Sequence, residues 1–130
     1  MRGKILIIED NEQNLYLATF LLEKNGYEIV PARRGPEGIA IAGRIRPDGI
    51  LLDIQLPEMD GYAVARALRQ DGRLDGVPIV AVTSYAMVGD RERALEAGCN
   101  AYIEKPINPE TFVEEIERAL GRRSPERGAR

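Results

Sequence analysis

Four short apolar runs in this chain each end beside a side chain that could take part in phosphoryl transfer. Glu9 and Asp10 follow the first run, Asp53 the second, Thr83 the third and Lys105 the fourth. A carboxylate can attack phosphorus, adjacent acids attract a divalent cation, and a hydroxyl or ammonium group can bind phosphoryl oxygens. If the runs are neighbouring parallel strands, these groups meet where open α/β sheets bind their ligands. The sequence therefore predicts a site for a divalent cation and a phosphoryl group.

Each of these residues also has an ordinary structural explanation. Asp53 could belong to a turn, Asp10 or Asn11 could cap the following helix, and Thr83 could do the same for a later one. A single lysine such as Lys105 is typically a solvated surface charge. The coincidence of suitable groups at four strand ends is what favours a shared site. Catalysis there would consist mainly of positioning and charge neutralisation.

The composition narrows the chemistry further. The chain of 130 residues is long enough for one domain, contains no histidine and has a single cysteine, Cys99. Mechanisms that need an internal histidine are excluded, and oxygen ligands favour a hard cation, Mg²⁺ first. No apolar stretch approaches the roughly 20 residues of a membrane helix, and the N-terminus passes directly into a strand pattern. We therefore expect a cytoplasmic protein that does not enter a membrane.

The charge distribution separates a body from a tail. The formal net charge is −3, yet residues 121–130 contain four arginines and one glutamate. The remaining body is therefore acidic, which argues against nucleic acid as a partner of the domain. We expect residues 1–120 to form one domain and residues 121–130 to be a basic, flexible C-terminal tail.

Hydrophobic periodicity and turn residues predict five strands that alternate with five helices. The expected strands are Lys4–Ile8, Tyr27–Val30, Gly49–Leu52, Ile79–Val82 and Asn100–Ile103. The expected helices are Glu12–Asn25, Gly35–Ile45, Tyr62–Gln70, Met87–Ala97 and a last helix capped by Asn108 that reaches about Leu120. This alternation predicts an α/β fold with a doubly wound, five-stranded parallel sheet, (βα)5. A flavodoxin-like strand order, 2-1-3-4-5, would bring the first, third and fourth strands together, although periodicity alone does not select it.

The residues at the strand ends resemble those of response-regulator receiver domains. The resemblance runs from Lys4 to about Leu120 and is carried by Glu9-Asp10, Asp53, Asp60-Gly61, Thr83, Tyr102 and Lys105-Pro106. Several stretches are similar to single-domain regulators of the DivK type, namely Glu9–Asn11, Asp53–Glu58, Ala86–Asp90 and Gly98–Ile103. Two positions depart from the usual pattern, because Glu9 stands where aspartate is more frequent and Ser84 where alanine is common.

The resemblance implies a phosphoacceptor and a metal site. Asp53 would accept a phosphoryl group from the phosphohistidine of a sensor histidine kinase or a histidine phosphotransfer protein. Such an external donor suits a chain without histidine. Asp10, Asp53 and the backbone carbonyl of Gln55 would bind Mg²⁺, and Glu9 would contact the ion through water.

The resemblance also implies a conformational switch. Lys105 and the Thr83 hydroxyl would bind phosphoryl oxygens, and Pro106 would fix the backbone, with a cis bond as one option. Movement of Thr83 would let Tyr102 turn inward and would remodel the surface formed by the last two strands and the last two helices. The output would be a changed affinity for a downstream protein, with a phosphorylation-dependent dimer as one further option. The domain would be a signalling phosphoacceptor that promotes only its own phosphorylation and dephosphorylation, not an enzyme.

Four other interpretations remain open at this point. The chain could be a receiver fragment of a larger regulator, or a pseudo-receiver that binds partners without being phosphorylated. A phosphatase of the haloacid-dehalogenase type needs a general acid two residues after its nucleophile, where this chain has Gln55. A flavodoxin-like cofactor binder is disfavoured because the loop after the first strand is acidic.

Overall fold

Five parallel strands form the centre of the molecule in the order β2-β1-β3-β4-β5. They are β1 (Gly3–Ile8), β2 (Tyr27–Ala32), β3 (Gly49–Asp53), β4 (Ile79–Thr83) and β5 (Ala101–Glu104). The computed structural model describes residues 2–84 and 87–121. Its strand order confirms the flavodoxin-like topology and places β1, β3 and β4, which carry most of the predicted site, side by side.

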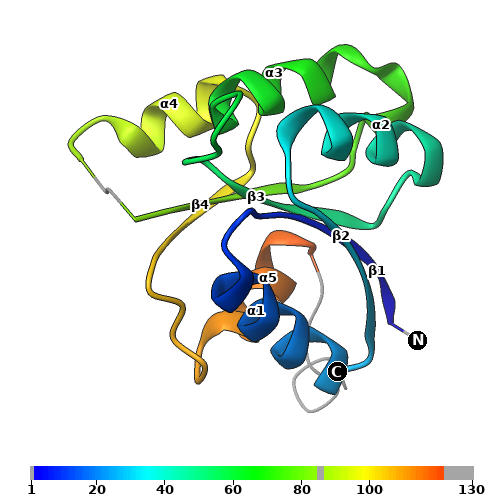
Figure 1. The fold of residues 1–130 in the computed structure, drawn as a ribbon, viewed down its shortest axis with the longest axis vertical. Helices are drawn as coiled ribbons and strands as arrows, with labels where there is room; N and C mark the ends of the chain where they lie inside the picture. The colour runs from blue at the N-terminus through cyan, green and yellow to red at the C-terminus, as the bar shows by residue number, and fades with distance from the viewer. Residues whose placement is uncertain (1, 85–86, 122–130) are drawn as a thin grey trace.

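Helices cover both faces of the sheet, as the βα alternation predicts. They are α1 (Glu12–Lys24), α2 (Gly35–Ile45), α3 (Gly61–Gln70), α4 (Asp90–Glu96) and α5 (Phe112–Ala119), with a short 3₁₀ turn, η1 (Gly72–Leu74). Helices α1 and α5 lie on one face, and α2, α3 and α4 lie on the other (Figure 1). Among the described residues, no helix combines the length and apolarity needed to cross a bilayer.

The apolar runs of the sequence are buried because both faces of the sheet are covered. Along β1, Ile5 and Ile7 pack toward the α1/α5 layer, whereas Leu6 and Ile8 pack toward the α2/α3/α4 layer. This alternation follows from the two-residue period of a strand. Continuous apolar runs are the expected pattern for parallel strands between two helix layers.

Side-chain caps fix the starts of two helices that follow the site. Asn11 caps α1 because its side chain accepts a hydrogen bond from the Asn14 N–H at 2.9 Å. Asp60 caps α3 in the same way through the Ala63 N–H. Caps of this kind satisfy backbone donors that have no partner within the helix. Asn11, rather than Asp10, is therefore the cap of the first helix, which leaves Asp10 available to the site.

The predicted starts of the last two helices are wrong by a few residues. Helix α4 begins at Asp90 instead of Met87, because Gly89 adopts a left-handed φ of 91° and the Asp90 carboxylate accepts the Met87 N–H. Helix α5 begins at Phe112, and Asn108 instead caps the turn before it by accepting the Glu110 N–H. Residues 122–130 of the predicted tail lie outside the described residues.

A glycine packed against backbone fixes the loop that leaves β3. The Gly61 N–H donates to the Ile54 carbonyl at 2.9 Å. A Cβ at Gly61 would lie 2.5 Å from the Ile54 Cα and 2.8 Å from the Asp53 carbonyl oxygen. Only a residue without a side chain fits at this approach. The contact holds α3 directly against the backbone that carries Asp53.

Candidate functional site

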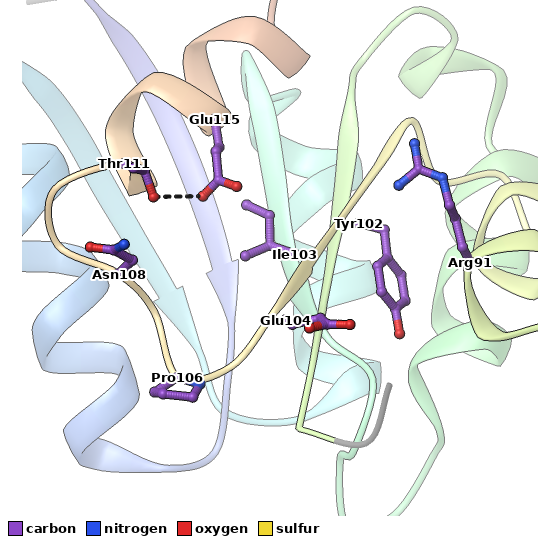
Figure 2. A pocket seen from close by; sticks show the side chains of 8 residues that line it. All are labelled: Arg91, Tyr102, Ile103, Glu104, Pro106, Asn108, Thr111 and Glu115. Atoms are coloured by element: carbon purple, nitrogen blue, oxygen red, sulfur yellow. Dashed lines mark hydrogen bonds between the residues drawn. The ribbon is translucent and has the colours of Figure 1, made fainter. Parts of the chain in front are cut away.

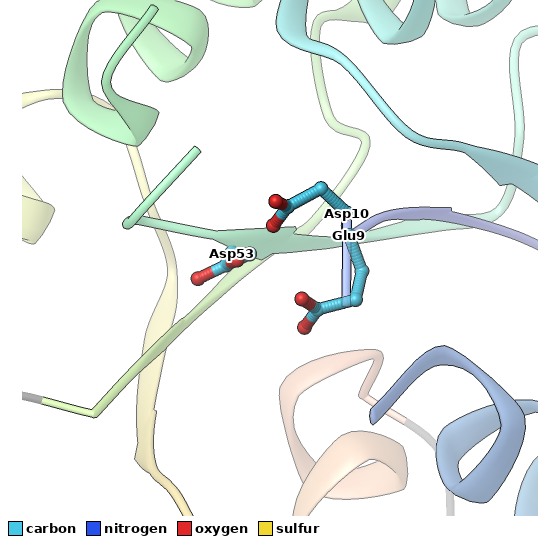
Figure 3. A group of neighbouring side chains, drawn as sticks. All are labelled: Glu9, Asp10 and Asp53. Atoms are coloured by element: carbon cyan, nitrogen blue, oxygen red, sulfur yellow. The ribbon is translucent and has the colours of Figure 1, made fainter. Parts of the chain in front are cut away.

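Three carboxylates gather at the carboxyl ends of β1 and β3 (Figure 3). Asp53 is the last residue of β3 and is only 3% exposed, Glu9 follows β1 and is buried, and Asp10 is exposed. One carboxylate oxygen from each lies within 4.8 Å of the others. The predicted convergence of these acids is therefore present, with Asp10 on the solvent side.

A buried lysine lies between two of these acids. The Lys105 Nζ is 3.0 Å from the Glu9 Oε1 and 3.4 Å from the Asp53 Oδ1, and its side chain is 9% exposed. Lys105 follows β5, and its N–H donates to the Thr83 carbonyl at 2.8 Å. The Lys105–Pro106 peptide bond is cis. The structure thus brings residues from three strands to one point at the edge of the sheet.

The local electrostatics favour an added positive charge. Burial, and next the charge of Asp53, raise the pKa of Glu9 from its usual 4.5 to about 7. The hydrogen bond from Lys105 acts in the opposite direction without overcoming the burial. Among the described side chains here, three carboxyl groups lie together, and the Lys105 ammonium group pairs with two of them, Glu9 and Asp53. A cation in the cluster would stabilise the ionised form of all three.

The oxygen-only donor set suits a hard divalent cation. Mg²⁺ takes carboxylate, carbonyl and water oxygens, and it usually retains several waters. Glu9, Asp10 and Asp53 offer oxygens at mutual distances compatible with one ion, and Asp10 opens the cluster to solvent. The backbone carbonyl of Gln55 lies in the loop directly after Asp53. The Gln55 N–H donates to the Asp53 Oδ1 at 3.0 Å, which holds this part of the loop beside the carboxylate. The residues present therefore fit the predicted metal.

Thr83 is connected to the cluster through the side chain of Gln55. Thr83 is buried at the end of β4, and its Oγ1 accepts a hydrogen bond from the Gln55 Nε2. The Gln55 Oε1 accepts the Ser84 N–H at 2.9 Å. The sequence places Gln55 beside the site, but no local pattern indicates these side-chain contacts.

Tyr102 lies apart from the carboxylates, on β5, where it is half-buried against the α2/α3/α4 layer. Its hydroxyl is buried and has no hydrogen-bond partner among the described residues. Burial, followed by the charge of Asp90, raises the pKa of the Tyr102 hydroxyl. Figure 2 shows Tyr102 at a pocket of about 430 Å³ between α4 and the start of α5. The pocket is lined by Arg91, Tyr102, Ile103, Glu104, Pro106, Asn108, Thr111 and Glu115.

Comparison with known proteins agrees with this geometry. Residues 5–117 match the response regulator receiver domain family. The chain is 46% identical over 121 residues to the polar-differentiation response regulator DivK of Brucella anthropi, which covers 93% of this chain and 98% of that protein. DivK of Brucella ovis matches with the same identity and the same coverage.

Solved structures show the same fold. The Vibrio cholerae chemotaxis protein CheY4 superposes with a TM-score of 0.86 at 27% identity, covering 92% of this chain and 99% of that one. The receiver domain of a Pseudomonas aeruginosa sensor histidine kinase superposes with a TM-score of 0.84 at 36% identity, covering 92% and 98%. That receiver domain holds a magnesium ion in its active-site cleft.

Proposed function

The chain belongs to the response regulator receiver domain family, and we propose that Asp53 is its phosphoacceptor. The observation that carries the proposal is the position of the Asp53 carboxylate. It ends a buried strand 3.4 Å from the Lys105 ammonium group and within 4.8 Å of two further acids. A carboxylate placed between a lysine and a hard-cation site is suited to attack phosphorus.

The proposed reaction moves a phosphoryl group from a phosphohistidine of a sensor histidine kinase or histidine phosphotransfer protein. An Asp53 carboxylate oxygen forms the new O–P bond as the P–N bond breaks, and the electron pair stays on the imidazole nitrogen. Hydrolysis later returns the carboxylate and inorganic phosphate. Lys105 and the Thr83 hydroxyl bind the phosphoryl oxygens, and their placement supplies the positioning on which phosphoryl transfer depends.

We propose that Asp10, Asp53 and the Gln55 backbone carbonyl hold Mg²⁺, with Glu9 acting through water. When bound, the ion neutralises negative charge on the phosphoryl oxygens. Glu9 contributes by orienting Lys105, which its Oε1 contacts at 3.0 Å. Its second carboxylate oxygen accepts a hydrogen bond from the Asn11 N–H at 3.1 Å, so each oxygen of the Glu9 carboxylate has a partner.

The proposed output is a shift between two conformations. Thr83 moves toward the phosphoryl group, and Tyr102 turns further inward, which remodels the face formed by β4, α4, β5 and α5. Two observations support this. The Tyr102 hydroxyl is buried without a hydrogen-bond partner among the described residues, and Tyr102 lines the pocket on this face. A ligand that prefers one state shifts the population toward it. The downstream partner is a protein, or a second phosphorylated copy of the chain.

We further propose that this domain acts as a signalling phosphoacceptor in the cytoplasm, with residues 1–120 as the receiver unit and 121–130 as a basic tail. The haloacid-dehalogenase alternative is disfavoured because Gln55 carries no acidic proton. Its carboxamide is also already engaged in hydrogen bonds with Thr83 and Ser84.

The decisive experiment measures phosphate gain by intact mass after incubation with a small acyl phosphate and Mg²⁺. We expect the wild-type protein to gain one phosphoryl group and Asp53→Asn to gain none. Asp75→Asn is a matched control, since Asp75 is exposed and lies before β4, whose opposite end carries Thr83. Equal labelling of Asp53→Asn and the wild-type protein would remove Asp53 as the acceptor.

A further inference from the structure

The Gln55 side chain occupies two polar groups at the end of β4. Its Nε2 donates to the Thr83 Oγ1, and its Oε1 accepts the Ser84 N–H at 2.9 Å. The Gln55 backbone N–H donates to the Asp53 Oδ1 at 3.0 Å. One residue therefore connects the acceptor carboxylate to both neighbouring groups of the β4–α4 connection.

We propose that the Gln55 carboxamide is a latch that stabilises the unphosphorylated arrangement of Thr83 and Ser84, and that a phosphoryl group must displace it. This inference rests on the proposed function of Asp53. It assigns Gln55 a positioning role through its side chain, separate from the backbone carbonyl proposed to bind the metal.

The chemistry of the groups supports the displacement. A phosphoryl group on Asp53 presents oxygens that only accept hydrogen bonds, so it needs donors. The Ser84 N–H, directly after Thr83 at the end of β4, is the donor that we expect a phosphoryl group to use, and the Gln55 Oε1 already accepts its hydrogen bond. A backbone N–H has a single proton to donate. The carboxamide oxygen and a phosphoryl oxygen therefore compete for it.

The same carboxamide restrains the threonine. Thr83 is buried, and its Oγ1 accepts a hydrogen bond from the Gln55 Nε2. Movement of Thr83 toward Asp53 has to lengthen or break this contact, or carry the Gln55 side chain along. Since Gln55 is only half-buried, its side chain has room to leave toward solvent once the phosphoryl group arrives.

The Gln55 contacts would stabilise only the unphosphorylated arrangement. They would therefore lower the affinity of the site for a phosphoryl group, which requires the other arrangement. Removal of the latch should therefore strengthen binding of a phosphoryl group or its analogue. The expected gain is about five- to tenfold, as for about one net hydrogen bond between neutral groups. A side chain that merely supported the fold would give the opposite result, because its loss would weaken the site.

The test compares wild-type protein with Gln55→Met, which keeps the length of the side chain and removes both hydrogen bonds. The probe is the beryllofluoride anion with Mg²⁺, titrated against ¹⁵N-labelled protein. We expect Gln55→Met to bind the anion about five- to tenfold more tightly. In the anion-free protein, we expect the Ser84 amide to show faster hydrogen exchange and a shifted resonance. Gln70→Met, on the exposed end of α3, should match the wild-type protein in both measurements.

Two outcomes would overturn the latch while leaving the proposed function intact. One is beryllofluoride binding by Gln55→Met that is equal to or weaker than wild-type binding. The other is an unchanged Ser84 amide in the anion-free variant. Gln55→Asn, which is one methylene too short to reach both groups, serves in the same tests if Gln55→Met does not fold. Failure of the wild-type protein both to bind the anion and to gain phosphate would instead refute the proposed function.

Discussion

Gly61→Ala is the substitution whose consequence follows most directly from the coordinates. The new Cβ would lie 2.5 Å from the Ile54 Cα and 2.8 Å from the Asp53 carbonyl oxygen. Both are backbone atoms, so no side-chain rotation can relieve the overlap. Reaching an ordinary contact of 3.4 Å requires the β3–α3 loop to move by about 0.9 Å against the Gly61–Ile54 hydrogen bond.

The expected loss of stability is about 1–3 kcal/mol, the range for forced overpacking, and it should lie toward the upper end because backbone must move. The higher helix propensity of alanine offsets less than about 1 kcal/mol of this cost. Displacement of the Asp53 backbone should also slow its phosphorylation, since a misplacement of about 1 Å can reduce a rate by up to about 100-fold.

Urea denaturation measures the first effect, and the initial rate of phosphate gain from an acyl phosphate measures the second. Gly72→Ala is the matched control, because a Cβ at Gly72 meets no atom within 4 Å. We expect this control to unfold near the wild-type midpoint and to be phosphorylated at the wild-type rate. The reasoning is refuted if Gly61→Ala unfolds at the same urea concentration as Gly72→Ala and is phosphorylated as fast.

Three further predictions address Lys105, the Cys99 thiol and the partly buried ion pair of Glu117. Lys105→Ala should keep the fold but weaken the effect of phosphorylation on partner affinity, because the ammonium group 3.4 Å from the Asp53 Oδ1 is lost. A pull-down of a partner protein with and without phosphorylation tests this. If phosphorylation changes the amount of captured partner as much in the variant as in the wild-type protein, the result counts against the role of Lys105. Burial raises the pKa of the Cys99 thiol from 9.0 to about 11, so the unfolded chain loses the thiol proton first and folding should weaken between pH 9 and 11. The loss should reach about 2 kcal/mol at pH 11 relative to Cys99→Ala, and parallel stability curves for the two proteins in urea titrations would contradict it. Glu117→Ala should lower the free energy of unfolding by about 1–3 kcal/mol, because it leaves the buried Tyr27 hydroxyl without this acceptor and removes the ion pair with Arg2. Glu117→Gln should lose less in the same urea titration, and equal losses would show that the acceptor oxygen is not what matters.

The fold and the residues of the site could be predicted from the sequence, because the buried runs mark the strands and the residues that follow them mark one edge of the sheet. In a parallel sheet, the residue after each buried run falls at the same edge whatever the detailed register, so Asp10, Asp53 and Thr83 could be placed together before any coordinates. The start of α4 was not accessible in this way. Met87 and Val88 fit a helical pattern, yet both are exposed, and the left-handed Gly89 separates them from the helix. The glycine was visible in the sequence, but its φ depends on the loop around it.

The side-chain role of Gln55 shows a second limit. Its contacts join a residue of the β3–α3 loop to two residues at the end of β4, 28 and 29 positions away in the chain. A pairing of this kind depends on the rotamer of one flexible side chain and on the separation of two loops. Neither quantity has a periodic signature, so the sequence could place Gln55 beside the site without indicating which groups its side chain would contact.

The partners of Lys105 explain what the unusual Glu9 contributes. The extra methylene of glutamate lets one oxygen reach the Lys105 Nζ at 3.0 Å while the other accepts the Asn11 N–H. The ammonium group is therefore closer to Glu9 than to the Asp53 Oδ1, which lies at 3.4 Å. In the proposed reaction the new phosphoryl oxygens become stronger partners than either carboxylate, because they bring additional negative charge next to the same ammonium group. Glu9 then holds Lys105 ready beside Asp53 in the resting state and must yield it on phosphorylation, as Gln55 must yield the Ser84 N–H.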